Sequence, residues 1–268
     1  MDLDASIVSG SLVVFSGGLV GLSLGATGGG GALLAVPLLV YVLKIPVQSA
    51  VGMSLILVGV SAWIGVWQQR QKGTVKVKAA LVFSSTGMVG AWVGAQGHQL
   101  VRDELVLLLF GMLMLMISAK MLWSSNRLSD DQPHIRCADE FPRSCVVKVV
   151  MLGLGVGLLT GFFGVGGGFV IVPSLVFVLG FPMRVAIATS LLIIAIISLG
   201  GVIGHSPMTN FDVVRLVLLL AGSATGMLLG AQISKRVSSQ TLTKLFASVA
   251  IVIAVSLILD NLSSALYS

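Results

Sequence analysis

The chain has 268 residues, of which 56% are hydrophobic and only 10% are charged, and its mean hydropathy is +1.05. A soluble domain needs polar surface residues that this composition does not supply, so soluble classes are excluded. The net charge of +6 does not indicate nucleic acid as a partner, because the basic residues lie in a few loops between apolar runs. The sequence therefore predicts an all-α polytopic membrane protein.

Ten apolar segments are predicted, in two groups of five. They cover residues 6–24, 29–43, 47–68, 79–98 and 104–123, and then 146–163, 166–180, 183–204, 213–232 and 241–260. Between the groups lies a polar loop, 124–145, with mixed charge and two prolines, which divides the chain into a first transmembrane repeat (1–123), a linker and a second transmembrane repeat (146–268).

The second segment of each group has about 15 residues, with a proline inside and glycines at its start. We expect these two segments to be short helices, half-helices or re-entrant elements rather than ordinary spans.

The two groups are copies of one unit. A shift of 136 residues places Gly25–Pro37 (GATGGGGALLAVP) over Gly161–Pro173 (GFFGVGGGFVIVP). Sixteen of the thirty-five positions in 21–55 are identical to those in 157–191, without a gap. Self-similarity of this length indicates a duplicated structural unit.

Basic residues predict how the two copies are oriented. The loop 69–78 has four Lys or Arg residues and its counterpart 205–214 has none, whereas 99–104 has one and 235–244 has three. Because Lys and Arg favour the cytoplasmic side, equivalent loops are expected on opposite sides, as in an inverted repeat. Both termini are then expected outside, and the linker inside.

Inversion requires an odd number of crossings in each half. Either all five segments cross, or the first two form a V that enters and leaves on one side. Five crossings are favoured, because the first segment is long enough to span the bilayer.

The glycine runs are the candidate substrate site. A helix that breaks at glycines inside a membrane leaves backbone N–H groups without partners, and the helix that follows presents free donors and a partial positive charge. Such a terminus binds anions, and two breaks would meet near the midplane. The candidate substrate-binding residues are Thr27, Gly28, Gly30, Gly31 and Ser54 in the first repeat, and Thr160, Gly164, Gly166, Gly167, Gly168 and Ser190 in the second.

Glycines also let membrane helices approach closely. We expect this packing role for Gly90 and Gly94 and for their equivalents, Gly226 and Gly230. For the tandem glycines, substrate binding or gating is favoured over packing, because such dense runs disrupt a helix.

The positions of the charged residues favour an anion as the substrate. All ten acidic residues lie in tails, loops or segment ends, whereas a cation carrier commonly has a carboxylate at membrane depth. No catalytic arrangement, metal cluster or nucleotide motif is present in the sequence, so we expect no enzyme activity, cofactor or metal. The two cysteines, Cys137 and Cys145, are not expected to form a disulfide framework.

These residues resemble a known family. The doubled pattern, GLSLGATGGGGALLAVP…IPVQSAVGMSL and GLLTGFFGVGGGFVIVP…FPMRVAIATSL, is similar to the TauE/SafE sulfite exporter family over nearly the whole chain. The resemblance implies a multi-pass inner-membrane permease for sulfite, sulfonates or other small organic anions. This chain has Ala32 where the second repeat has Gly168, and Lys44 where it has Gly180, so the second half is expected to dominate binding.

Alternating access between the inverted repeats is the expected mechanism. An anion channel or a non-transporting scaffold on the same repeat is the alternative, and flux that saturates with substrate would exclude it. The expected partners are a small anion and the lipid bilayer, without nucleic acid. A homodimer, the direction of transport and a coupling ion stay open.

Overall fold

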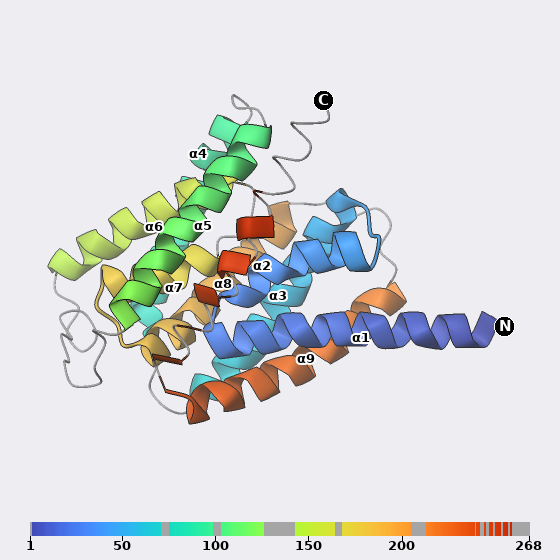
Figure 1. Cartoon of the computed structure of the whole chain (residues 1–268). Helices are drawn as coiled ribbons and strands as arrows, with labels where there is room; N and C mark the ends of the chain where they lie inside the picture. The colour runs from blue at the N-terminus through green and yellow to red at the C-terminus, as the bar shows by residue number, and fades with distance from the viewer. Residues whose placement is uncertain are drawn as a thin grey trace.

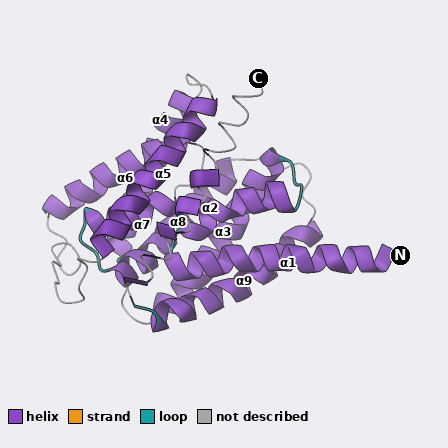
Figure 2. Ribbon diagram, viewed as in Figure 1, coloured by secondary structure: helices purple, strands orange, loops and turns teal. Residues whose placement is uncertain are grey.

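The computed structural model describes most of the chain, and Figure 1 shows its course. The described residues are 2–70, 75–98, 103–125, 143–163, 168–204, 213–238, 240–241, 244, 247–248, 250–252, 254–256 and 258. Within them, all regular structure is helical and no strand occurs (Figure 2). The all-α class is confirmed.

The helices follow the predicted apolar segments to within a few residues at each end. They are α1 (Asp2–Thr27), α2 (Gly30–Pro37), the π-helical turn η1 (Leu38–Val42), α3 (Val47–Arg70), α4 (Val77–His98), α5 (Asp103–Ser125), α6 (Arg143–Phe163), α7 (Gly168–Phe177), α8 (Met183–Gly204) and α9 (Val213–Arg236). The described residues from 240 to 258 are also helical, inside the tenth predicted segment.

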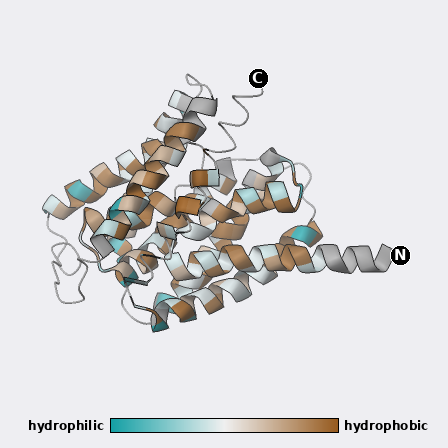
Figure 3. Cartoon of the chain, in the orientation of Figure 1, coloured by the Kyte–Doolittle hydropathy of each residue, from teal (hydrophilic) through white to brown (hydrophobic). Residues whose placement is uncertain are grey.

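Five of the described helices are long and apolar enough to cross a membrane, and Figure 3 shows many hydrophobic residues among the paler ones on the helices. These are α1, α4, α6, α8 and α9. Shorter apolar helices cover Gly30–Val42, Leu108–Trp123 and Gly168–Phe177. The first and last of these are the second segments of the two groups, which were predicted to be short. Ten crossings stay a prediction.

Two close helix pairs flank the centre of the molecule. α1 lies beside α9, and α4 lies beside α6, with α2, α3, α7 and α8 between the pairs (Figure 1). Within the first pair, Gly17 of α1 faces Leu219 of α9 and Gly25 faces Met227, so the two helices run parallel. The second pair is also parallel, because Gly90 of α4 faces Leu154 of α6 and Gly94 faces Leu158.

Small residues set the spacing of both pairs. A methyl group added at Gly226 would overlap the carbonyl oxygen of Gly18, and one at Gly230 would overlap that of Leu22. Gly90 and Gly94 meet the backbone of α6 in the same way. The predicted packing role of these four glycines is therefore confirmed, and backbone-to-backbone contact replaces the hydrophobic effect as the source of attraction inside lipid.

α3 and α8 cross the centre in opposite directions. Gly59 of α3 faces Ser198 of α8, whereas Gly65, further along α3, faces Leu191, earlier in α8. α8 is the most buried of the five candidate spans, with 61% of its window inside the molecule, against 28% for α6. α6 therefore lies at the periphery and α8 in the core.

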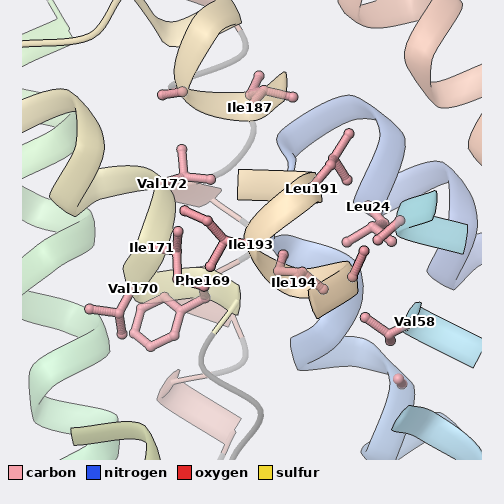
Figure 4. Close-up of a cluster of buried hydrophobic side chains, with 14 of the residues drawn as sticks. Leu24, Val58, Phe169, Val170, Ile171, Val172, Ile187, Leu191, Ile193 and Ile194 are labelled. Carbon is pink, nitrogen blue, oxygen red and sulfur yellow. The ribbon is translucent and has the colours of Figure 1, made fainter. Parts of the chain in front are cut away.

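The core is centred on α7 and α8. Figure 4 shows Phe169–Val172 of α7 against Ile187, Leu191 and Ile193 of α8. All of these side chains are buried, and Gly168–Pro173 is buried on every face. A helix that is apolar all round is stable only when neighbours surround it, which explains why so short a segment is helical here.

The two short helices end in equivalent ways. After η1, the amide of Ile45 donates to the carbonyl of Leu39 at 3.0 Å, and after α7 the amide of Phe181 donates to that of Leu175 at 3.1 Å. Each bond joins a donor to the carbonyl six residues earlier, and the chain turns back through a left-handed residue just before the donor. Gly180 supplies it with φ of 69°, but Lys44 adopts φ of 55° with a full side chain.

One expectation about the cysteines is wrong. Cys145, in the first turn of α6, is disulfide-bonded. The other cysteine of the chain, Cys137, lies outside the described residues. Spacing along a sequence does not report distance in space, so the pattern could not reveal this bond.

Replacing Lys44 by Gly should stabilise the protein. A non-glycine residue in the left-handed region costs about 1–2 kcal/mol, partly offset by the greater freedom of glycine in the unfolded chain, so the expected gain is about 0.5–1 kcal/mol. Gly180→Ala, the matched change, should lower stability by about 1 kcal/mol. Unfolding of the purified protein in detergent measures both. A loss of stability in Lys44→Gly would show that the lysine side chain outweighs the strain.

Candidate functional site

The first glycine break joins α1 to α2 in two residues. α1 ends at Thr27, Gly28 is left-handed with φ of 75°, and Gly29 caps α2 with φ of −156°. Gly28 is suited to this position because a side chain would strain the left-handed backbone and press on α8. An added Cβ there would lie 2.7 Å from Ser190 Oγ and 2.8 Å from the Cα of Ile187.

Thr27 bridges the break with its hydroxyl. Its Oγ1 accepts a hydrogen bond from the amide of Gly30 at 2.9 Å and donates to the carbonyl of Ser23 at 2.7 Å. The side chain is 2% exposed, so this cap lies inside the protein. One of the amides at the start of α2 is thereby satisfied without water.

Two other amides at the same helix start have no such partner. Gly29 and Gly31 are buried. The amide of Gly29 donates no hydrogen bond within the described part of the chain, and that of Gly31 lies in the first turn of α2, where no carbonyl of the same helix can accept from it. A buried amide without a partner is rare and costs about 1–3 kcal/mol. The start of α2 therefore offers two donors to a ligand, at the positive end of the helix dipole.

Ser190 of α8 connects the break to the second repeat. Its Oγ, fully buried, can donate to the carbonyl of Gly28 at 2.9 Å or to that of Ile187 at 2.8 Å. Gly29 also touches the backbone at Gly168, where α7 begins. Residues of both glycine runs thus lie side by side in the core.

The structure brings together Thr27, Gly28, Gly30, Gly31, Gly168 and Ser190. Thr160 is half-buried and bonds the carbonyl of Gly157 in its own helix at 2.8 Å, and Ser54 is buried on α3. Gly164, Gly166 and Gly167 lie outside the described residues.

Two polar contacts between distant parts of the chain were not predicted from the sequence. The amide of Lys76, just before α4, donates to Thr189 Oγ1 at 3.2 Å, and Ser61 of α3 shares a hydrogen bond with Ser223 of α9. Both contacts join residues more than 100 positions apart. Thr189 had one sequence signal, its position beside Ser190, but no pattern pointed to Lys76.

The acidic residues that the structure describes lie at helix starts. The described acidic residues are Asp2 and Asp4 at the start of α1, and Asp103 and Glu104 at the start of α5, so none lies at membrane depth in the part of the chain that the structure describes. The described residues also contain no group of three His, Cys, Asp or Glu that could hold a metal ion. What the break offers is a set of neutral hydrogen-bond donors.

Comparison with known proteins gives a consistent result. The family model described as "Sulfite exporter TauE/SafE" matches residues 13–257. A "Probable membrane transporter protein" of Xylella fastidiosa (strain 9a5c) is 34% identical over 250 residues, which cover 92% of this chain and 94% of the relative. The "Probable membrane transporter protein YdhB" of Bacillus subtilis (strain 168) is 29% identical, covering 82% of this chain and 87% of the relative.

A more distant relative comes from an archaeon. The "Probable membrane transporter protein MJ0441" of Methanocaldococcus jannaschii is 26% identical over 72% of this chain and 71% of its own length. No solved structure matches the chain. All three relatives carry the name of probable membrane transporter proteins, and the family model covers both glycine runs and nearly every described helix. The chain is a multi-pass membrane transporter that belongs to the TauE/SafE sulfite exporter family.

Proposed function

We propose that this transporter moves small oxyanions, with sulfite or an organosulfonate as the substrate class, by alternating access between inverted repeats. The observation that carries the proposal is the pair of buried amides at the start of α2: that of Gly29 donates no hydrogen bond within the described residues, and that of Gly31 has no acceptor in its own helix. An oxyanion supplies several acceptor oxygens and a negative charge, which suit these amides and the helix dipole together.

A cation does not suit this place. The hydroxyls of Thr27 and Ser190 can both donate to backbone carbonyls, and no carboxylate lies at membrane depth in the described residues. A buried cation without a carboxylate would have to be held by carbonyl oxygens alone. The family name and the lack of a carboxylate at membrane depth among the described residues thus favour the same charge sign.

The helix directions support the inverted repeat. The shift of 136 residues makes α3 equivalent to α8, and these two helices pack in opposite directions. It also makes α1 equivalent to α6 and α9 equivalent to α4. The equivalence therefore relates the pair α1–α9 to the pair α6–α4, and both pairs are parallel. An axis that reverses helix direction would relate the halves in this way.

Exposed aromatic residues support the orientation that the basic loops predict. Trp67 is 73% exposed near the end of α3, and Trp123 is 79% exposed near the end of α5. Both lie near basic residues at the side predicted to be cytoplasmic. Tyr41 in η1 and Trp92 in α4 lie toward the helix ends that are predicted to face outside. Tryptophan and tyrosine collect at both membrane interfaces, so these positions are those expected of two belts.

A carboxylate at Ser190 should abolish anion binding. In Ser190→Asp, the side chain beside the carbonyl of Gly28 is either an ionised carboxylate or a neutral carboxylic acid. The ionised form repels an oxyanion, and the neutral form, which is larger than serine, obstructs it. Ser198→Asp is the matched control, because Ser198 is also buried on α8 but lies two turns away. Sulfite affinity of detergent-stable variants should fall at least about 100-fold for Ser190→Asp only.

Two smaller substitutions, Ser190→Ala and Gly226→Ala, test the same site if either acidic variant fails to fold. Ser190→Ala should weaken sulfite binding severalfold by releasing Gly28, whereas Gly226→Ala should lower the unfolding temperature before it lowers affinity. Sulfite uptake that saturates in proteoliposomes would separate a carrier from a channel or a scaffold. Normal affinity in Ser190→Ala with lost affinity in Gly226→Ala would contradict the site.

The orientation is tested by labelling from the two sides. Single cysteines at Thr74 and Thr209, in a chain without Cys137 and Cys145, should react from the cytoplasmic and the external side respectively. A disulfide at Cys145 is unusual for a cytoplasmic position, which gives this experiment added value. Labelling of both sites from the same side would contradict the inverted repeat.

A further inference from the structure

The segment that connects α3 to α4 reaches the proposed site through Lys76. The amide of Lys76 donates to Thr189 Oγ1 at 3.2 Å, and the Thr189 side chain is fully buried. The next residue, Ser190, lies 2.9 Å from the carbonyl of Gly28. A lysine from a basic loop is thereby tied to the turn of α8 that touches the glycine break.

A second polar group lies at the same end of the helices. α3 and α8 are antiparallel, with Gly65 facing Leu191, so Gln68 lies at the level of Ala188 and Thr189. The Oε1 atom of Gln68 is buried, and it has no hydrogen-bond partner in the described residues. Buried polar atoms of this kind mark places where water or a ligand completes the hydrogen bonding.

The equivalent positions in the other repeat differ in chemistry. The shift of 136 residues makes Thr189 equivalent to Met53, which has no hydroxyl, and Lys76 equivalent to Asp212, which has the opposite charge. The hydrogen bond between Lys76 and Thr189 is therefore not a feature that duplication alone produced. It distinguishes the face that carries the basic loop from the opposite one.

We propose that Lys76 determines anion affinity at the cytoplasmic mouth of the site and that Thr189 is the residue that positions it. This rests on the proposed function, since it assigns a residue to the same anion site. The glycine break provides neutral donors only, so a nearby ammonium group supplies the field that favours an anion over a neutral solute. Without the Thr189 hydroxyl, the amide of Lys76 loses this hydrogen bond to α8, and Lys76 is held less closely at the mouth.

Four variants test the two roles. Lys76→Gln removes the charge and keeps the backbone amide, and Lys76→Arg keeps the charge. Thr189→Val removes the hydroxyl at nearly constant shape, and Thr189→Ser keeps it. Lys78→Gln is the matched control, because it makes the same change of net charge two residues away on an exposed side chain.

The readouts are the Kd of sulfite for purified protein and the KM for sulfite in proteoliposomes. Lys76→Gln and Thr189→Val should each weaken affinity on the order of tenfold, and Lys76→Arg, Thr189→Ser and Lys78→Gln should stay near the parent. The double variant Lys76→Gln/Thr189→Val should be no weaker than Lys76→Gln alone, because both changes remove one interaction. The affinity of Lys76→Gln should also depend less on ionic strength than that of the parent.

The outcomes separate this proposal from the proposed function. If the parent binds no sulfite or sulfonate, the proposed function is wrong. If the parent binds sulfite and Lys76→Gln behaves like Lys78→Gln, the role of Lys76 is wrong while the anion site remains. Additive losses in the double variant would show that Thr189 acts on stability and does not position Lys76.

Discussion

The requirement that every buried backbone amide find a partner governs this structure. Inside a membrane no bulk water is available, so an unbonded N–H group must be satisfied by protein or by a ligand. The chain meets this requirement with helices almost everywhere that the structure describes. At Gly28 and Gly29 it interrupts the helix. Thr27 satisfies the amide of Gly30, while that of Gly29 donates to nothing in the described residues and that of Gly31 has no acceptor in its own helix. A departure from the rule at the centre of a transporter indicates function.

Glycine serves two separate purposes in this protein. Along α1, α4, α6 and α9 it lets backbones touch, and a methyl group at Gly226 or Gly94 would overlap a neighbouring carbonyl. At Gly28 it supplies a left-handed backbone that ends one helix and starts another. The first use holds the outer pairs together, and the second exposes donors. Spaced glycines and tandem glycines occur in both halves of the sequence, but only three-dimensional contacts show what each described glycine does.

Asymmetry between the repeats arises from single residues. Lys44 occupies a left-handed position that Gly180 fills without strain. Thr189 bonds Lys76, whereas the equivalent of Thr189 in the first repeat is Met53. A carrier built from two identical halves would present the same chemistry to both sides of the membrane. Under the inverted repeat that we propose, differences of this kind allow the two sides to bind a substrate unequally.

The sequence by itself determined the membrane class, the internal repeat, the short second segments and the helix ends to within a few residues. These follow from composition and from local rules, because apolar length and backbone hydrogen bonding act over a few neighbouring residues. The packing of α1 on α9, the contact of Ser190 with Gly28, the disulfide at Cys145 and the bond between Lys76 and Thr189 were decided only by the tertiary structure. Except for the disulfide, whose partner lies outside the described residues, they join residues more than 100 positions apart, and no local pattern encodes which helix faces meet.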